Sequence, residues 1–411
     1  MDNINKLDRN ECTGCLACLN MCPKKCISIY TDELGFQYPV IDEGKCIHCG
    51  LCSNTCPALN KTKRDNLNQD EIYAVINKDY ITWKRSSSGG AFAAICEEYC
   101  KNNPNTTIYG ASYNKEDISV QHIGVEFKDI NKIQKSKYVQ SNISNIYNEI
   151  ENKLKNGEHV IFSGTPCQNY ALKNYLRIKN ISLDKTLFID LICHGVGSPR
   201  TFKESILDIL KRNNINKNDV ANVNNRGKRV KLFETDAYNT EIITDKEIKH
   251  ISKYNDLHLN LFLQKLNCRD SCENCQFASE NRNSDITIAD FKNFYCEFPK
   301  FFNKKNASTM IIHTNKGKSI FNNMNNIKKY ESNIDVIKRN NPIYFNSIKC
   351  SNQEKRNKFI AEIKSESTSS ACIKCMQKYA NMPSTKEKIK SIVPEPFRQK
   401  IKILLNKWRN K

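Results

Sequence analysis

The sequence lacks an apolar run long enough to cross a lipid bilayer. Its longest apolar stretches, such as residues 186–193, fall far short of the ~20 apolar residues that a membrane-spanning helix needs. The N-terminus, Met1-Asp2-Asn3-Ile4, has no basic segment followed by an apolar one, so no secretory signal is predicted. We therefore expect a cytoplasmic protein.

Acidic residues are too few to balance the basic ones. The 64 Lys and Arg residues exceed the 44 Asp and Glu residues, which gives a formal net charge of +20. The excess favours an acidic protein partner, an anionic membrane surface or an anionic substrate, and charge alone leaves nucleic acid open. A basic composition without any such partner is the alternative.

The cysteine content indicates metal or redox chemistry. The chain has 411 residues, a length that suits a small module followed by one or two larger α/β domains. Hydrophobic residues make up 39% of the sequence and charged residues 26%, as in ordinary globular proteins. Its 20 cysteines point to ligation or redox chemistry, because structural disulfides are rare in the cytosol.

The pattern CxxCxxCxxxCP occurs twice near the N-terminus, where Pro23 and Pro57 close the two runs. In two-cluster bacterial ferredoxins this run binds 4Fe–4S centres, and the last cysteine of each run ligates the other centre. Zinc is the alternative, but zinc sites use two separated CxxC or CxxH pairs, and a nucleic-acid-binding zinc module is disfavoured with it. We predict two 4Fe–4S centres, one held by Cys12, Cys15, Cys18 and Cys56 and the other by Cys22, Cys46, Cys49 and Cys52.

The pattern of apolar residues predicts four regions and an α/β fold. Residues 1–60 form the two-cluster ferredoxin-like domain, residues 61–71 a polar linker, residues 72–345 a larger mixed α/β domain and residues 346–411 a basic extension. Within the larger domain, strands are expected at 72–76, 159–162 and 187–193, and helices at 90–100, 168–176 and 201–210. Alternating strands and helices place functional loops at strand ends.

Several loops of the larger domain carry chemistry-bearing residues. Residues 85–90 (Arg-Ser-Ser-Ser-Gly-Gly) precede a helix and could hold a phosphate, although a plain turn with a helix cap is the commoner use. Residues 163–168 and 190–195 follow predicted strands. Residues 268–275 contain a CxxC and run into residues 282–291.

Together these segments resemble the coenzyme F420 hydrogenase/dehydrogenase beta-subunit family, from the ferredoxin repeat to about residue 300. Residues 136–141 match its Ser-Lys-Tyr-Val-Gln-Ser motif. Relatives include subunits of deazaflavin-reducing hydrogenases and formate dehydrogenases, 7-hydroxymethyl chlorophyll a reductase, and bacterial members found with polysaccharide biosynthesis. The resemblance implies FAD beside iron–sulfur clusters, with these residues near the flavin: Ser88, Gly89, Lys137, Tyr138, Gln140, Ser141, Gly164, Thr165, Pro166 and Gln168.

A third cluster is predicted within the larger domain. Cys167 and Cys193 each lie at a predicted strand end, and Cys272 and Cys275 supply a CxxC, so that four thiolates are available for one more 4Fe–4S site. Cys268 is the reserve ligand. The alternative is that Cys167 and Cys193 are merely buried and that the CxxC is a free pair.

Two residues are candidates for catalysis. His194 could exchange a proton at the flavin, with a structural hydrogen bond as the alternative. Asp290 could orient substrate or flavin, with a helix cap as the alternative. Residues 289–293 read Ala-Asp-Phe-Lys-Asn where many relatives have Gly-Asp-Phe-Trp-Gly, so the backbone after Asp290 and the substrate pocket are expected to differ.

The remaining cysteines are expected to be structural. Cys26 is predicted to be a small buried residue in a short helix, and Cys96 and Cys100 share one helical face and should belong to a core. Cys372 and Cys375 form a lone CxxC, which is weak evidence for a metal. Residues 397–408 have apolar residues at helical spacing among basic ones, which predicts an amphipathic helix that docks on protein or lies on an anionic membrane surface.

The favoured interpretation is an oxidoreductase in which FAD exchanges electrons with a small-molecule substrate and the clusters connect it to a ferredoxin or a partner subunit. An electron-transfer subunit without its own substrate is the alternative. A nucleic-acid module is the third reading, and we expect no nucleic-acid partner. The residues do not distinguish coenzyme F420 from a carbonyl, alcohol or sugar-derived substrate.

Overall fold

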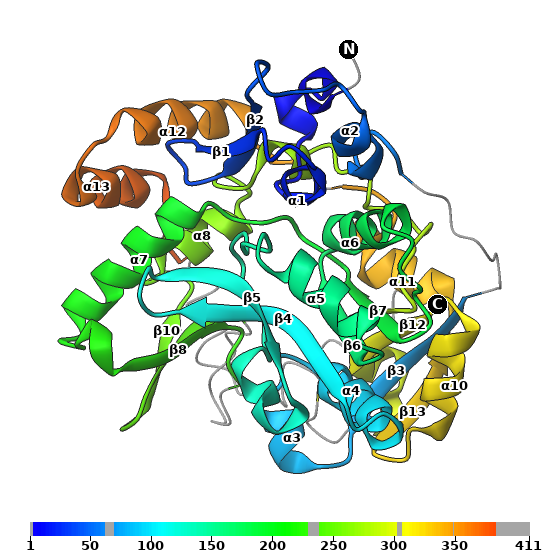
Figure 1. Ribbon diagram of the computed structural model, residues 1–411. Helices are drawn as coiled ribbons and strands as arrows, with labels where there is room; N and C mark the ends of the chain where they lie inside the picture. The colour runs from blue at the N-terminus through cyan, green and yellow to red at the C-terminus, as the bar shows by residue number, and fades with distance from the viewer. Residues whose placement is uncertain (1–2, 62–69, 229–237, 302–305, 348, 384–411) are drawn as a thin grey trace.

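The computed structural model describes residues 3–61, 70–228, 238–301, 306–347 and 349–383 (Figure 1). The predicted amphipathic helix at 397–408 and most of the predicted linker lie outside these residues. Among the described residues, the helices are all too short or too polar to span a bilayer.

The N-terminal module has two short helices that follow the cysteine loops. Cys22 is the C-cap residue of helix α1 (Ala17–Met21), and Cys56 is the C-cap residue of helix α2 (Leu51–Thr55). The fourth cysteine of each run therefore directly follows a helix. The two helices pack on each other, and strands β1 (Ile27–Thr31) and β2 (Gln37–Ile41) form an antiparallel hairpin beside them. Cys26 is buried as predicted, but the helix predicted there is wrong, because the chain passes directly from Cys26 into β1.

An eight-stranded mixed sheet forms the centre of the larger domain. Its order is β13-β3-β12-β11-β7-β6-β4-β5. Neighbouring strands are parallel from β4 through β6 and β7 to β11, and antiparallel in the outer pairs. The strands are β3 (Glu71–Asn77), β4 (Thr106–Asn114), β5 (Ser119–Val125), β6 (His159–Gly164), β7 (Thr186–Leu191), β11 (Ile286–Asp290), β12 (Ser308–Ile312) and β13 (Ile327–Ser332). The α/β fold class and the strands predicted near 72, 159 and 187 are confirmed.

Helices cover both faces of this sheet. Helices α4 (Ala91–Asn102) and α10 (Asn315–Asn323) pack on the face that carries Ile161, whereas α5 (Ile146–Lys155) and α6 (Pro166–Ile178) pack on the face that carries Val160 and Phe162. Adjacent residues of a strand point to opposite faces, so the apolar run at 160–162 reflects burial on both sides. Helix α6 begins two residues earlier than predicted because Thr165 and Gln168 form a capping box at its start.

A small sheet and several further helices complete the domain. Strands β8 (Val220–Asn225), β9 (Asn239–Thr244) and β10 (Ile248–Ser252) form the three-stranded sheet, which shares a core with α7 (Pro199–Arg212). The other helices are α3 (Tyr80–Lys84), α8 (Leu257–Leu263), α9 (Phe294–Glu297), α11 (Ile334–Asn340), α12 (Gln353–Ser365) and α13 (Ser369–Tyr379).

The N-terminal module packs tightly against the larger domain. Helices α1 and α2 contact α6, and Cys15, Ala17 and Met21 share the core of α5 and α6 (Figure 1). On its other side the β1–β2 hairpin packs with α8, α12 and α13 in a core that contains Cys372 and Cys375. The lone CxxC thus contributes to packing, and Cys96 lies in the sheet core as predicted.

Candidate functional site

The candidate site lies at the carboxyl ends of β6, β7 and β11. These strands are parallel, so the residues that follow them meet at one edge of the sheet. Gly164 ends β6 and Thr165 follows it, Cys193 and His194 follow β7, and Asp290 ends β11. The loop at 85–90, which follows β3 and α3, joins this edge through Ser88, whose Oγ lies 2.7 Å from Ser308 Oγ at the start of β12.

The first thiol group consists of Cys12, Cys15, Cys18 and Cys56, all of which are buried. Burial raises the pKa of the Cys18 thiol well above its usual value, and the neighbouring thiols of Cys15, Cys12 and Cys56 raise it further. Burial likewise raises the pKa of Cys56 to about 12, with contributions from Cys15 and Cys12. Cys56 therefore lies near the thiols of the first run, which is the arrangement that the predicted crossed ligand set requires.

The second thiol group consists of Cys22, Cys46, Cys49 and Cys52, which line one cavity together with Cys26. Cys26 Sγ lies 3.3 Å from Cys22 Sγ, so Cys26 is a fifth thiol at this cavity. Burial raises the pKa of Cys26 to about 12, and Cys22 and Cys46 add to the rise. Cys49 is exposed, so the second thiol group reaches the surface.

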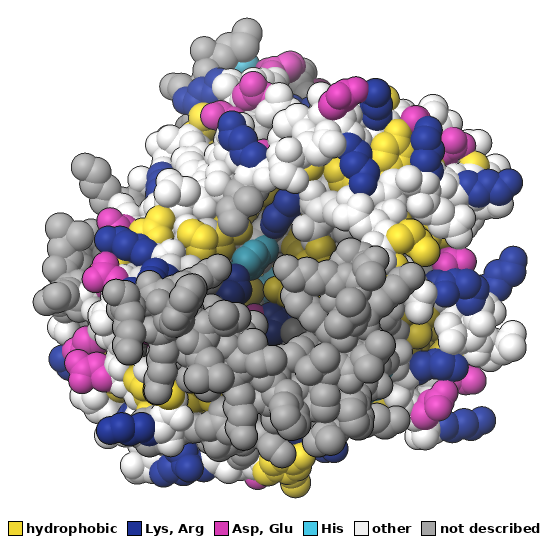
Figure 2. All heavy atoms as spheres, turned by 180° about the vertical axis from the view of Figure 1, so that it is seen from behind, with side chains coloured by type: hydrophobic (Ala, Val, Ile, Leu, Met, Phe, Trp, Pro, Cys, Tyr) yellow, Lys and Arg dark blue, Asp and Glu magenta, His cyan; other side chains and the backbone are white. Residues whose placement is uncertain are grey.

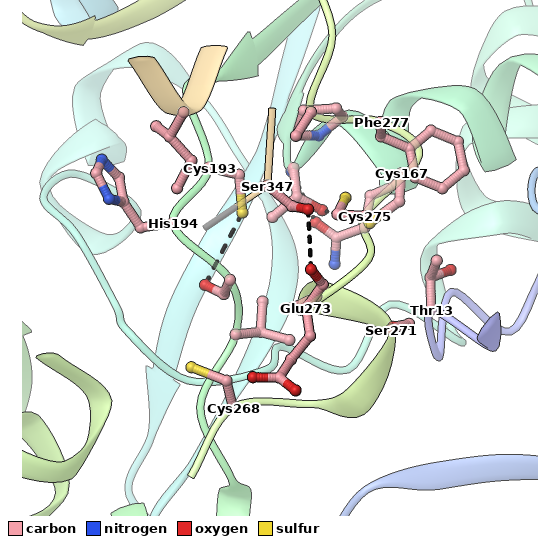
Figure 3. A pocket seen from close by; sticks show the side chains of 18 of the residues that line it. Thr13, Cys167, Cys193, His194, Cys268, Ser271, Glu273, Cys275, Phe277 and Ser347 are labelled. Carbon is pink, nitrogen blue, oxygen red and sulfur yellow. Dashed lines mark hydrogen bonds between the residues drawn. The ribbon is translucent and has the colours of Figure 1, made fainter. Parts of the chain in front are cut away.

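A third thiol cavity lies between the sheet edge and the N-terminal module. Figure 3 shows cysteines approaching it from separate segments: Cys193 from the loop after β7, Cys167 from the start of α6, and Cys268 and Cys275 from the 268–275 segment. Cys272 completes the set of five. The structure thus brings all four predicted ligands and the reserve ligand to one cavity, which spacing alone did not establish.

The chemistry of this donor set fits a metal cluster. Burial raises the pKa of the Cys272 thiol well above its usual value, and Cys193, Cys268 and Cys275 raise it further. Burial also raises the pKa of Cys193 to about 11, and Cys275 adds to it. Thiols held close together without a countercharge resist ionisation, and a bound metal supplies the charge that stabilises their thiolates.

The third thiol cavity adjoins the first thiol group. Burial raises the pKa of Cys167, and the neighbours that contribute include Cys275, Cys193 and Cys15 of the first thiol group. Thr13, within the first cysteine loop, lines the third thiol cavity. The two thiol sites are therefore neighbours across the interface between the N-terminal module and the larger domain.

A larger cavity of about 440 Å³ opens at the sheet edge, within the size range of small-molecule sites. Both predicted catalytic residues, His194 and Asp290, line it. Three residues predicted near the flavin do not line this cavity. Gly89 lies next to Ser88, and its backbone nitrogen donates a hydrogen bond to Ser308 Oγ. Gln140 and Pro166 line the third thiol cavity. The residues predicted near the flavin that line the large cavity are Ser88, Lys137, Tyr138, Ser141, Gly164, Thr165 and Gln168.

Basic side chains outnumber acidic ones in the lining of the large cavity, although Lys135 pairs with Glu241 and Arg226 with Asp290. Lys135, Lys137, Arg226 and Lys265 line it, and Figure 2 shows basic side chains and a histidine within a hollow on this face. Burial, together with the neighbouring charge of Lys135, lowers the pKa of Lys137 to about 7. The positive charges favour an anionic ligand such as one carrying phosphates.

His194 is uncharged in this setting. Burial lowers the pKa of its imidazole to about 3, and Lys265, Lys292 and Arg226 contribute. Asp290 accepts a hydrogen bond from the Arg226 guanidinium. Sequence reasoning missed Arg226 and Lys265, because a single basic residue gives no signal in a basic chain and these two reach the cavity only through folding.

Two protein-family models match parts of this sequence. Residues 11–60 match the 4Fe–4S dicluster domain, and residues 157–334 match the C terminus of the coenzyme F420 hydrogenase/dehydrogenase beta subunit. Residues 157–334 therefore carry the C-terminal domain of the coenzyme F420 hydrogenase/dehydrogenase beta-subunit family, beside a 4Fe–4S dicluster domain. The dicluster match makes it an iron–sulfur protein, and its 4Fe–4S clusters belong to the N-terminal module.

The protein is also similar to a chain of a solved structure. A chain from the F420-reducing [NiFe] hydrogenase complex of Methanosarcina barkeri is 13% identical, with 77% of this chain and 94% of that chain covered and a TM-score of 0.42. No curated protein matches the sequence.

Proposed function

We propose that the protein is an iron–sulfur flavoprotein oxidoreductase. The large cavity would hold FAD, the third thiol cavity would hold a third 4Fe–4S cluster, and the N-terminal module would connect them to a redox partner. One observation carries this proposal: the large cavity and the third thiol cavity share a wall. That wall consists of Thr165, Gln168, Cys193, His194, Gly195, Val196 and Lys265.

The residues of the large cavity suit a flavin dinucleotide. Lys137 and Arg226 supply cations for the pyrophosphate, and the hydroxyls of Ser87 and Ser136, 3.1 Å apart, supply donors nearby. Tyr138 stacks on Phe262 with ring centroids 4.8 Å apart, which fixes an aromatic wall. When bound, FAD would supply two-electron exchange with a substrate and one-electron exchange with a cluster.

His194 and Asp290 have different proposed roles. As a neutral imidazole, His194 is suited to hydrogen bonding rather than to donating a proton as a cation. Asp290 holds the Arg226 guanidinium and thereby orients a cation that faces the bound anion. Both groups therefore act as orienting groups in this proposal.

The second thiol group is the proposed contact point for a redox partner. Cys49 is exposed, and the neighbouring Ile47 is 55% exposed, so an apolar contact surface lies directly over this group. The basic side chains of Lys24 and Lys25 are also exposed on this module, whereas Lys45 pairs with Asp42 at 2.8 Å. A ferredoxin-type protein or a partner subunit with an acidic surface suits this combination.

Anaerobic purification followed by iron and flavin analysis tests the proposal. We expect about twelve irons and one FAD per chain, whereas about eight irons would overturn the third cluster. Cys193→Ser should lower the count to about eight, and Cys96→Ser, which replaces a thiol of the sheet core, should not. FAD without turnover of any hydride donor would favour an electron-transfer subunit that lacks its own substrate.

A further inference from the structure

Arg269 is a fully buried cation between the N-terminal module and the larger domain. Its side chain is 1% exposed, and its guanidinium donates three hydrogen bonds. Nε donates to the Cys12 carbonyl at 2.6 Å, Nη2 to the Gln37 carbonyl at 2.9 Å, and Nη1 to Gln140 Oε1 at 2.9 Å. One side chain of the larger domain therefore holds both the first cysteine loop and the β1–β2 hairpin.

Gln140 extends the same arrangement onto the first cysteine loop. Its Nε2 donates to the Thr13 carbonyl at 3.1 Å and to the Gly14 carbonyl at 3.3 Å. Gly14 has φ +66°, and a Cβ there would lie 2.3 Å from Gln140 Nε2 and 2.7 Å from Arg269 Nη1. The loop needs glycine because the two side chains approach its backbone this closely.

The charge of Arg269 needs a buried anion. All three of its hydrogen-bond acceptors are uncharged oxygens, and the guanidinium lies over the ring of Tyr38 at 4.3 Å. A desolvated cation is costly unless an anion compensates it. The thiolates of the first thiol group are close enough to do so, because Arg269 Nε bonds to the backbone of Cys12 and Nη1 would lie 2.7 Å from a Cβ at Gly14, the residue before Cys15.

Arg269 also lies between two thiol sites. Cys268, the preceding residue, lines the third thiol cavity, as do Thr13 and Gln140, which share its hydrogen-bond network. The guanidinium itself holds the backbone of Cys12, in the first thiol group. Its charge therefore acts on the first thiol group at the side that faces the third thiol cavity.

We propose that Arg269 is a positioning residue that raises the reduction potential of the 4Fe–4S cluster at the first thiol group and fixes its binding loop. The cluster with its thiolates carries a charge of about −2 when oxidised and takes up one electron on reduction, with no proton transfer. A nearby buried cation stabilises the more negative, reduced form. If the proposed function also holds, this favours electron flow from the third thiol cavity toward the N-terminal module.

Redox titration of the anaerobically purified full chain, followed by electron paramagnetic resonance, tests the proposal. In Arg269→Gln the midpoint potential of one ferredoxin cluster should fall while that of the other is unchanged, and Arg269→Lys, which keeps the charge, should restore most of the loss. Gln140→Glu should also lower that potential, because it places a carboxylate against Nη1. Arg200→Gln is the matched control, since Arg200 holds the same hairpin through the Glu33 carbonyl.

Unchanged potentials in Arg269→Gln at full iron content would overturn the proposal. If Arg269→Gln fails to assemble its clusters, Gln140→Glu decides, and an unchanged potential there would overturn the proposal equally. An equal shift in Arg200→Gln would assign the effect to loosening of the module instead. The result is independent of the proposed function, because a chain with eight irons and no flavin would show the same shift.

Discussion

The guanidinium of Arg226 bonds to the carboxylate of Asp290 in the wall of the large cavity. Asp290 ends β11 of the eight-stranded sheet, and Arg226 follows β8 of the three-stranded sheet. Asn341 Nδ2 donates to the Asp290 carbonyl at 3.0 Å and thus steadies the strand end. The ion pair therefore joins the two sheets and fixes a cation at the cavity.

Asp290→Asn should destabilise the protein by roughly 1–3 kcal/mol, because it leaves the largely buried guanidinium of Arg226 without a counterion. Added pyrophosphate or FAD should stabilise this variant more than the parent, because an anion in the cavity replaces the lost charge. Anaerobic urea unfolding measures both effects. Asp335→Asn is the control, because its weak pair with Lys338 is exposed, and equal losses in both variants would contradict the prediction.

FAD affinity should depend on the protonation of Lys137. Its pKa is lowered to about 7 by burial and Lys135, and a bound pyrophosphate favours the charged form. Apparent affinity should therefore fall about fivefold between pH 7 and pH 8 as the free protein loses this proton. Flavin fluorescence quenching across that range measures the effect.

Lys137→Met should bind FAD more weakly at pH 6.5 and show a flat profile above it. Lys128→Met is a suitable control, because the Lys128 side chain is 74% exposed on the surface. If the FAD affinity of the parent protein is constant from pH 6.5 to 8.5, Lys137 does not contribute a charge to flavin binding.

His122 should make the protein acid-labile. Its Nε2 donates to the Ser163 carbonyl at 3.0 Å, and burial lowers its pKa from 6.5 to about 4. Between pH 6.5 and about pH 4 the imidazole is protonated in the unfolded chain but neutral in the folded protein. The free energy of unfolding therefore decreases as the pH is lowered through this range. The loss should be roughly 2 kcal/mol between pH 7.5 and pH 5.

Urea unfolding at these two pH values checks this prediction. In His122→Gln the amide keeps a donor for the Ser163 carbonyl without titrating, so the variant should lose less stability on acidification than the parent. The same loss in both proteins would assign the acid sensitivity to other groups.

The third thiol cavity offers five thiols for four ligand positions. Cys167 reaches the cavity from the start of α6, whereas Cys268 reaches it from the same segment as Cys272 and Cys275, so these two thiols compete for the fourth position beside Cys193, Cys272 and Cys275. We predict that Cys167→Ala loses about four irons and that Cys268→Ala retains about twelve. The reverse result would make Cys268 the fourth ligand and leave Cys167 as a buried thiol.

Gly89→Ala should disrupt the flavin site. A Cβ at this position would lie 2.2 Å from the backbone nitrogen of Ser308 and 2.2 Å from the Val75 carbonyl oxygen, so the loop would have to shift. We expect loss of bound FAD and destabilisation of a few kcal/mol, on the order of other overpacking substitutions. Gly44→Ala, whose nearest contact would be 3.4 Å away, should behave as the parent. Full flavin content in Gly89→Ala would contradict the prediction.

The sequence by itself determined the local features. Cysteine spacing identified the N-terminal module, because ligands of one loop must lie close together in the chain to converge on one cluster. Apolar runs located β3, β6 and β7, and helical periodicity located α4, α6 and α7, because burial on sheet and helix faces follows the repeat of each element. It failed at Cys26, where a strand follows instead of a helix.

Only the tertiary structure decided how distant segments combine. It placed Arg269 against the Cys12 carbonyl, 257 positions away in the sequence, and Arg226 against Asp290. It also moved Gln140 from the expected flavin environment to the first cysteine loop. Such contacts depend on how the module packs on α6 and how the two sheets meet, and neither spacing nor periodicity carries that information. Cysteine spacing in the sequence identifies the thiols that can bind clusters, whereas tertiary packing determines which charged side chains lie beside them.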